Sequence, residues 1–360
     1  MKRVGILTYH SANNYGTCLQ AYALQEAIEK AGGSAEIIRF QGEKLAVPPV
    51  GRQGLMARLI DMIVKTGAKV VKGIAQPAFE SFRRDYFHYS KAVDSKTISD
   101  ANDVYDLFVS GSDQVWNYHI AGDLGVYLQR FVNDPGKRGS YAASFGITEL
   151  SAEWEQEYRE ALEGFRYLSV RETEGADLIR ELTGREATVV VDPTQLIDAT
   201  EWDKVMKPVR TPKQYIFVYQ LGLSSRLLAF ARALSRETGL PLVFTPFPVG
   251  QLVPGRYHPA ISPAQWLYLM RHADYVVTNS FHGTAFSIGF QKNFFSEVSA
   301  NLSALSSRIV GMLDRYGLKN RLIDGNLPPD LSAIDYEKVL PQYLEDRQQS
   351  LAFLTDMLKG

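Results

Sequence analysis

The sequence contains a single cysteine, Cys18, in 360 residues. One cysteine cannot form a disulfide within the chain, and it cannot build a cysteine-rich metal site. Cys18 stands among small and apolar residues with no base evident beside it. We therefore interpret it as a packed helix residue rather than as a nucleophile.

An excess of charge of one sign is also missing. The 39 basic residues are balanced by 40 acidic ones, and the formal net charge is -1. A balanced chain has no broad positive field for a polyanion, so nucleic acid is a poor candidate partner. Local basic pockets for a small anion remain compatible with this composition.

Long apolar runs are absent as well. No stretch approaches the roughly 18 apolar residues of a membrane-spanning helix. The first residues, Met1 to His10, read as a strand and have neither the apolar core nor the cleavage site of a signal peptide. We expect a cytoplasmic protein with no transmembrane segment.

The length and the pattern of apolar residues predict two α/β domains. Domains usually hold roughly 100–200 residues, so 360 residues favour two cores. Short apolar runs such as Tyr275–Thr278 alternate with helical stretches such as Pro263–His272 and Thr284–Phe290, which is typical of parallel sheets in doubly wound folds. Asp192-Pro193 begins a stretch with little periodicity, so the junction is placed there. We predict Rossmann-like domains at 1–198 and 199–330, and a C-terminal helix at 331–360 that returns to the first domain.

Ligands of open parallel sheets bind outside the carboxyl ends of the strands, so the strand-to-helix turns carry the candidate sites. The first turn, Tyr9 to Thr17, contains Asn13, Asn14 and Tyr15. Its amides can exchange hydrogen bonds with sugar hydroxyls, and the N–H groups of the helix start favour an anion or a sugar oxygen. The alternative is a plain capped turn with Thr17 as the N-cap. Further along the chain, Pro48–Gln53 is expected to form a loop and Leu55–Val71 a helix.

The second turn, Ser110 to Asn117, combines Asp113, Gln114 and Trp116. A carboxylate accepts hydroxyl protons, and an aromatic ring can cover the apolar face of a sugar. These residues therefore indicate a sugar-binding site. The alternative is that Asp113 only caps the next helix.

The third turn places Arg171 at the end of a buried strand. A buried guanidinium is costly unless it is paired, and the neighbouring Glu172 points to the opposite side of a strand. A substrate phosphate or carboxylate could pair with it. The alternative is an ion pair with a protein carboxylate across the domain junction.

The fourth turn, Thr278 to Ala285, ends an apolar strand in a polar cluster. His282 has a pKa range suited to a general acid or base. Gly283 permits close approach, and Ser280 or Thr284 can cap the helix while its N–H groups face an anion. No paired-histidine or H-E-x-x-H metal motif accompanies the cluster, and the chain has neither a G-x-G-x-x-G turn nor a P-loop. We expect neither a metal nor a bound cofactor.

The ordered set of turns resembles the polysaccharide pyruvyl transferase family, from Val4 to about Ile323. The segments that carry the resemblance are YHSANNYGTCLQAYALQ (9–25), SGSDQVWN (110–117), YAASFG (141–146), SVRE (169–172), VDPT (191–194) and TNSFHGTAFS (278–287). The resemblance implies two Rossmann-like domains in a glycosyltransferase-B-like arrangement. It also implies transfer of the enolpyruvyl carbons of phosphoenolpyruvate onto two hydroxyls of a sugar, with formation of a ketal and release of phosphate.

The resemblance also implies roles for individual residues. His282 would be the acid, Arg171 would hold the anionic groups of the donor, and the second domain, with Asn279, Ser280, Gly283 and Thr284, would be the donor side. Asn14 and Asp113 would face the acceptor, a sugar or lipid-linked glycan precursor that could bring the protein close to a membrane. No cofactor is implied, because phosphoenolpyruvate is the donor substrate.

One position departs from the family pattern. Some members have an arginine two places before the histidine, and here that place is Ser280. We hypothesise that Arg308 supplies this charge from a neighbouring helix. Two other functions remain open: a sugar-nucleotide glycosyltransferase of the same architecture, with Glu297 for the donor ribose, and a non-catalytic glycan- or anion-binding protein.

Overall fold

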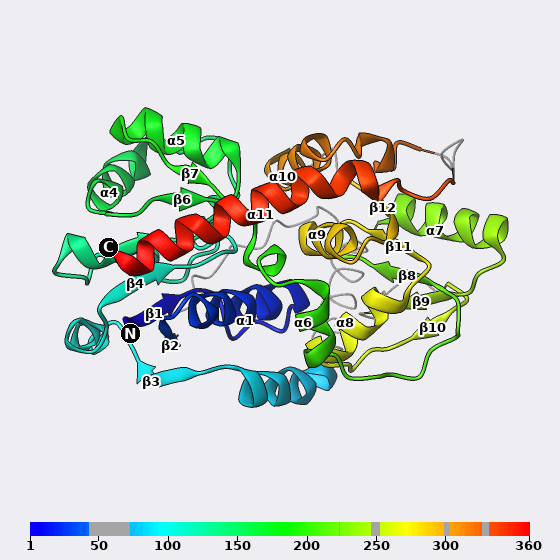
Figure 1. Ribbon diagram of the computed structural model, residues 1–360, viewed down its shortest axis with the longest axis horizontal. Coiled ribbons are helices and arrows are strands. Elements are labelled where there is room, and N and C mark those ends of the chain that lie inside the picture. Colours follow the sequence, from blue (N-terminus) through cyan, green and yellow to red (C-terminus); the bar gives the residue numbers. More distant parts are fainter. Residues whose placement is uncertain (43–72, 223, 246–252, 299–302, 326–330) are drawn as a thin grey trace, which may run out of the picture. The chain divides into compact units, whose positions relative to one another are not determined.

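The computed structural model describes residues 1–42, 73–222, 224–245, 253–298, 303–325 and 331–360 (Figure 1). The chain divides into two compact units. Unit 1 comprises Met1–Val47, Tyr86–Ile197 and Pro341–Gly360, and unit 2 comprises Pro48–Asp85 and Asp198–Leu340. The loop and helix predicted at Pro48–Gln53 and Leu55–Val71 lie outside the described residues.

The chain crosses between the units more often than the predicted domain ranges suggest. Residues 73–85 were placed in the first domain from sequence, but they belong to unit 2. The last helix, α11 (Tyr336–Lys359), is counted with unit 1 from Pro341 onward. The domain boundary was predicted after residue 198, and the chain passes from unit 1 to unit 2 one residue earlier, after Ile197.

Unit 1 is built on a five-stranded parallel sheet in the order β3-β2-β1-β4-β5. In the centre of the sheet, Ile6 of β1 is level with Ile37 of β2 and with Val109 of β4. A second pair of parallel strands, β6 and β7, follows, and an isolated bridge joins Ala143 to Val170. The strands are β1 (Arg3–Leu7), β2 (Ser34–Phe40), β3 (Tyr89–Val93), β4 (Leu107–Ser110), β5 (Arg138–Ser140), β6 (Ser169–Val170) and β7 (Thr188–Val189).

The helices of unit 1 begin and end at residues with clear capping roles. The side chain of Asn14 caps α1, and Gly32, at φ +92°, lies just beyond its end. Gly184, at φ +70°, ends α5 in the left-handed conformation that favours glycine. The α-helices up to this point are α1 (Tyr15–Lys30), α3 (Leu124–Tyr127), α4 (Ala152–Glu163) and α5 (Thr173–Thr183), and another helix covers residues 73–86.

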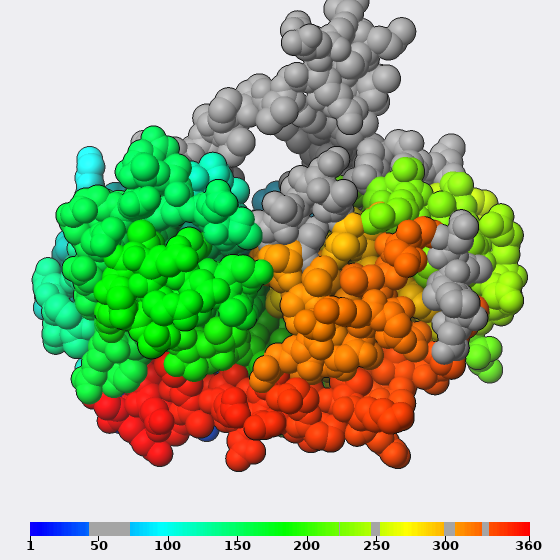
Figure 2. Space-filling model, turned by 90° about the horizontal axis from the view of Figure 1, so that it is seen from above, coloured from blue at the N-terminus to red at the C-terminus, as the bar shows by residue number. Residues whose placement is uncertain are grey.

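The core of unit 1 lies between the sheet and the helices α4 and α5. These two helices lie side by side at the surface of the unit (Figure 2). The core contains the rings of Phe108, Trp116, Phe145, Tyr158 and Phe165, all nearly or fully buried. Burial of such large rings is the main stabilising contribution that this part of the sequence offers.

Unit 2 repeats the arrangement with a parallel sheet in the order β10-β9-β8-β11-β12. Thr278, at the end of β11, is level with Tyr219 of β8 and with Ser296 of β12. The strands are β8 (Ile216–Tyr219), β9 (Leu242–Phe244), β10 (Arg256–Tyr257), β11 (Tyr275–Thr278) and β12 (Asn293–Ser296).

Helices cover both faces of the unit 2 sheet. Val218 and neighbouring apolar residues pack with α7 on one face, whereas Tyr219 packs against Trp266 of α8 on the other. Ser262 and Gln265 form a capping box at the start of α8, with Pro263 as its first residue. The remaining α-helices are α6 (Ala199–Val205), α7 (Ser225–Thr238), α8 (Pro263–His272), α9 (Phe281–Gly289) and α10 (Ser303–Arg315).

Two differences from the predicted elements affect the site. Helix α9 begins at Phe281, three residues before the predicted start at Thr284, so His282 lies in its first turn rather than ahead of it. Strand β3 (Tyr89–Val93) was not predicted, because most of its residues are partly exposed and the run shows no apolar pattern. Within the described residues, no helix combines the length and the apolar character that a membrane span requires.

Candidate functional site

The start of α9 is held by its own polar residues. Ser280 is the N-cap, and its hydroxyl oxygen accepts a hydrogen bond from the backbone N–H of Gly283 at 3.3 Å. The hydroxyl of Thr284 donates to the carbonyl of Ser280 at 3.0 Å and lies 2.8 Å from the hydroxyl of Ser296. His282 is the second residue of α9, two places after the cap, and it is 8% exposed. These contacts fix His282 at the carboxyl end of β11, where ligands of parallel sheets bind.

The space next to the Cα atom of Gly283 is filled by another part of the protein. A Cβ atom at this position would lie 2.4 Å from the hydroxyl oxygen of Thr278. The interpretation that Gly283 gives room to a ligand therefore needs correction, since the room is taken by Thr278 at the end of β11. Glycine is required here because α9 packs closely against the strand that precedes it.

Asn279 ties two strand ends together. Its side-chain oxygen accepts from the backbone N–H of Leu221 at 2.7 Å, and its side-chain nitrogen donates to the carbonyl of Leu221 at 3.1 Å. Both ends of the amide are therefore used by the protein. Asn279 shapes the edge of the site, and its predicted contact with the donor stays a prediction.

Arg308 belongs to α10, and its side chain reaches the ring of Phe281, the first residue of α9. Its guanidinium carbon is 5.9 Å from the centroid of the Phe281 ring, and that ring stands edge-on to His282 at 5.4 Å. Arg308 is 7% exposed. A cation over an aromatic face is stabilised by the ring quadrupole, so Arg308 and His282 both contact the ring of Phe281.

Glu297 follows β12 at the same edge of the sheet. It is 5% exposed, and its Oε1 accepts hydrogen bonds from Ser224 at 2.7 Å and from Nε of Arg226 at 2.9 Å. Ser224 is also the N-cap of α7. The carboxylate named for the ribose of a sugar nucleotide is therefore bound to the start of α7.

In unit 1, the first two candidate turns meet. Asn14 accepts a hydrogen bond from the backbone N–H of Thr17 at 3.2 Å, so Asn14 is the N-cap of α1, and the alternative that named Thr17 is wrong. The hydroxyl of Thr17 instead donates to Oδ2 of Asp113 at 2.7 Å. Asn13 is half-buried just before the cap, and Tyr15, the first residue of α1, is 4% exposed.

Asp113 has an unusual backbone conformation. Its φ is +74°, in the left-handed region that is uncommon outside glycine and that aspartate adopts more readily than most residues. Its Oδ1 accepts from the backbone N–H of Gln114 at 2.9 Å. Gln114 packs against Gly146, where a Cβ atom would lie 2.4 Å from its Oε1. The second turn is therefore tight, and its conformation is held by contacts of its own side chains.

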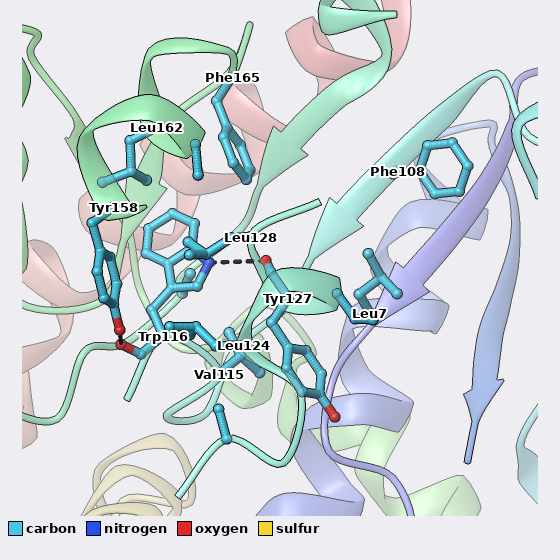
Figure 3. Packing of buried hydrophobic residues seen from close by; sticks show 14 of the residues in the cluster. Leu7, Phe108, Val115, Trp116, Leu124, Tyr127, Leu128, Tyr158, Leu162 and Phe165 are labelled. Carbon is cyan, nitrogen blue, oxygen red and sulfur yellow. Dashed lines mark hydrogen bonds between the residues drawn. The ribbon is translucent and has the colours of Figure 1, made fainter. Parts of the chain in front are cut away.

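Trp116 does not line the site. Its side chain is fully buried, and the indole N–H donates to the carbonyl of Tyr127 at 3.0 Å (Figure 3). Tyr158 and Phe165 stand beside it in the core of unit 1 (Figure 3). The prediction that this ring covers an acceptor sugar is wrong, because no face of it reaches the surface.

Arg171 forms the ion pair that was its alternative interpretation, although within unit 1 rather than across a junction. Its Nη1 donates to Oδ2 of Asp192 at 2.8 Å and to the hydroxyl oxygen of Ser112 at 3.2 Å. Burial lowers the pKa of Arg171, but the nearby carboxylates of Asp192 and Glu172 outweigh this effect, and the pKa is raised overall. The guanidinium is therefore permanently charged.

Glu172 extends the same buried network. Its Oε1 accepts from the hydroxyl of Ser144 at 2.6 Å and from the backbone N–H of Phe145 at 3.1 Å. Asp192 in turn accepts from the backbone and the hydroxyl of Thr194. The segments SGSDQVWN, YAASFG, SVRE and VDPT thus converge on one polar cluster beneath the strand ends of unit 1.

Sequence reasoning missed one pair at this edge, His10 and Tyr89. Nδ1 of His10 lies 3.3 Å from the hydroxyl of Tyr89, and their rings meet edge-on at 5.4 Å. His10 was visible in the first turn, but its partner belongs to the unpredicted strand β3. Among the described residues, no group of three His, Cys, Asp or Glu side chains is placed to hold a metal ion.

The comparison with known families decides the identity of the chain. The family model for polysaccharide pyruvyl transferase matches residues 14–296, most of the sequence. The chain belongs to the polysaccharide pyruvyl transferase family. Its members are transferases that act on polysaccharides, and the match includes all six segments that carried the resemblance, except for the first five residues of the first one. No curated protein matches the sequence significantly.

Solved structures support the fold class. The chain is similar to UDP-GlcNAc 2-epimerase from Methanocaldococcus jannaschii, with a TM-score of 0.51, 11% identity, and coverage of 95% of this chain and 91% of that one. A putative UDP-N-acetylglucosamine 2-epimerase from Listeria monocytogenes gives a TM-score of 0.51 at 9% identity, over 98% and 90% of the two chains. At such low identity the likeness shows the fold alone. The predicted fold of two Rossmann-like units of glycosyltransferase-B type is confirmed.

Proposed function

We propose that this family member transfers a pyruvyl group from phosphoenolpyruvate onto two hydroxyls of a sugar in a cell-surface polysaccharide or its precursor. The observation that carries the proposal is that His282 of α9 and Arg308 of α10 both contact the ring of Phe281. A histidine and a guanidinium, with a ring between them, stand where a parallel sheet binds its ligands. An acid next to a cation suits a donor that carries both a phosphate and a carboxylate.

The proposed reaction consists of two additions at C2 of the donor. A proton from His282 adds to C3 while one sugar oxygen forms a bond to C2 and gives up its proton. A second sugar oxygen then bonds to C2 as the bond from C2 to the phosphate oxygen breaks. The second hydroxyl proton leaves with the phosphate, and the product is a cyclic ketal.

The proposal changes the roles of two residues that were named from the sequence. Arg171 already pairs with Asp192 inside unit 1, so its part is to hold the strand ends in place rather than to bind the donor. Arg308 provides the positive charge that Ser280 lacks. Asn13, Asn14, Asp113 and Gln114 remain the proposed acceptor side, without Trp116.

Ligand-dependent melting tests the donor. A ligand that binds only the folded protein raises the melting temperature by mass action. Phosphoenolpyruvate is expected to raise it, whereas UDP-N-acetylglucosamine is not. The reverse result would favour the sugar-nucleotide glycosyltransferase, with Glu297 as its ribose partner.

Turnover tests the acid. Phosphate release from phosphoenolpyruvate is measured with a panel of p-nitrophenyl glycosides whose sugars carry free 4- and 6-hydroxyls. His282→Gln should lower kcat roughly 10²–10⁴-fold, the usual contribution of a general acid. His272→Ala, at the exposed end of α8, is the matched control and should leave kcat unchanged. Equal activity of the two variants would contradict the role of His282 and support a binding function.

A further inference from the structure

We propose that the side-chain amide of Gln220 binds the phosphate group of the donor. This inference rests on the proposed function, because it adds a contact to the phosphoenolpyruvate site of unit 2. Gln220 directly follows β8, so it lies at the carboxyl edge of the unit 2 sheet. Ligands of parallel sheets bind at this edge.

The amide of Gln220 is buried, and neither of its polar atoms has a hydrogen-bond partner among the described residues. The residue is 5% exposed, and both Oε1 and Nε2 are enclosed. Burial of an amide without a hydrogen bond is costly, and buried polar groups are therefore almost always paired. A glutamine that destabilises the fold at the ligand edge of the sheet favours a role in binding.

Other buried glutamines show how the protein treats a structural amide. Gln25 donates from Nε2 to the carbonyl of Tyr86 at 3.1 Å, and its Oε1 accepts from the backbone N–H of His88 at 2.7 Å. The Nε2 atom of Gln129 donates to three oxygen atoms. Within the described ranges, Gln220 is the one buried glutamine with both amide atoms unpaired. The fold therefore makes no use of this amide.

The backbone of Gln220 is fixed beside the turn that leads into α9. Tyr219, the residue before it, is level with Thr278 at the end of β11. The Asn279 amide binds both backbone groups of Leu221, the residue after it, at 2.7 and 3.1 Å. Because neighbouring strands lie about 4.8 Å apart, Gln220 stands next to the turn that begins the candidate donor site.

The chemistry of the amide selects the phosphate among the groups of the donor. A ligand that pairs both ends of the amide must offer an acceptor to Nε2 and a donor to Oε1. A carboxylate offers acceptors only, whereas a phosphate that carries a proton offers both. In the proposed reaction the phosphate leaves with the proton of the second sugar hydroxyl. Nε2 then donates to one phosphate oxygen, and the P–OH group donates to Oε1.

Phosphate binding includes a movement of the Gln220 side chain. Both amide atoms are enclosed, so the side chain must change rotamer toward the edge of the sheet to reach the phosphate. The hydrogen bonds gained there replace none within the described part of the protein, because the amide has none to lose. The neutral amide therefore favours the departing phosphate without adding a charge to the site.

The test combines the melting temperature of the full-length protein with isothermal titration of inorganic phosphate and of phosphoenolpyruvate. Gln220→Met keeps the length of the side chain and removes the amide. Without added ligand, the variant should melt at or above the wild-type temperature, since it loses an unpaired buried polar group. Its affinity for either ligand should fall roughly tenfold or more, as expected for a lost hydrogen bond to a charged group.

Gln25→Met is the matched control. It removes an amide that makes two hydrogen bonds within unit 1, so its melting temperature should fall while its affinity for both ligands stays unchanged.

Three results for Gln220→Met would overturn the inference. A melting temperature below that of the wild type would make the amide a structural group, paired for example with a buried water. Unchanged affinity for both ligands would remove Gln220 from the donor site. A loss of affinity for phosphoenolpyruvate alone would assign the amide to the carboxylate rather than to the phosphate. If the wild-type protein binds neither ligand, the proposed function itself fails, whereas the other results concern Gln220 alone.

Discussion

The guanidinium of Arg171 and the carboxylate of Asp192 meet at 2.8 Å with both side chains almost wholly excluded from solvent. Two segments, 21 residues apart, are joined by this contact, and Ser112 adds a third through its hydroxyl. A buried ion pair is a weak net stabiliser, but the loss of one partner leaves an uncompensated charge. The pair therefore fixes the arrangement of the strand ends more than it raises stability.

Replacement of Asp192 by alanine is expected to destabilise unit 1 strongly. The change leaves the charge of Arg171 buried without its main carboxylate, at a cost of about 3–5 kcal/mol. Urea denaturation followed by circular dichroism measures the free energy of unfolding. Arg180→Ala, which breaks the exposed pair of Arg180 with Asp177, is the control and should change it by less than about 1 kcal/mol. Similar decreases in the free energy of unfolding of the two variants would show that the buried pair contributes no more to stability than the exposed one.

The backbone of Asp113 leads to a second prediction. At φ +74° a β-branched residue is strained by about 1–2 kcal/mol, whereas glycine adopts this conformation freely. Asp113→Gly should therefore retain more stability than Asp113→Val. Both variants lose the hydrogen bond from Thr17, so the difference between their melting temperatures isolates the backbone effect. Equal melting temperatures would mean that the turn relaxes away from this conformation.

The sequence predicted those elements that have strong local signals. Pro263–His272 and Tyr275–Thr278 were predicted to the residue, because a serine-proline start and an apolar run mark them directly. The sequence left two possible caps for α9, Ser280 and Thr284, and the structure confirms Ser280, three residues before the helix start that had been predicted at Thr284. Strand β3 was missed because an edge strand with exposed side chains has no periodic pattern.

The sequence predicted which turns carry the site residues, but it did not predict which of these residues contact one another. Asp113 and Asn14 were both named, yet the link between them runs through Thr17, which was seen only as a cap. Trp116 was misplaced because a sequence does not show which side of a turn faces the core. Asp192 was read as a linker residue, and its pairing with Arg171 depends on tertiary contacts that no spacing reveals.

Gly283 provides a third prediction. Alanine at this position would bring a Cβ atom within 2.4 Å of the Thr278 hydroxyl, so α9 must shift, at a cost of about 1–3 kcal/mol. Because His282 precedes Gly283, the shift should also lower kcat. Thr278→Ala in the same chain should restore part of both losses, as it removes the closest atom.

Gly311→Ala in α10 is the control for this experiment. No atom lies within 4 Å of a Cβ at Gly311, and the residue is exposed. Alanine there should stabilise the helix by roughly 0.5–1 kcal/mol through its better helix propensity. A Gly283→Ala protein that behaves like Gly311→Ala would contradict the close packing of α9 on β11.

The last prediction concerns the charge that replaces the missing arginine at Ser280. Arg308→Ala should weaken the affinity for phosphoenolpyruvate roughly tenfold or more, because a hydrogen bond to a charged group contributes about 1.5–3 kcal/mol. Arg308→Lys should recover part of the affinity, since it keeps the charge but not the planar geometry. Isothermal titration calorimetry measures both values, with Arg315→Ala at the exposed end of α10 as the control. Unchanged affinity in Arg308→Ala would mean that the donor is held by other groups, whereas a loss confined to Arg308 would place the donor's anionic end beside Phe281 and His282.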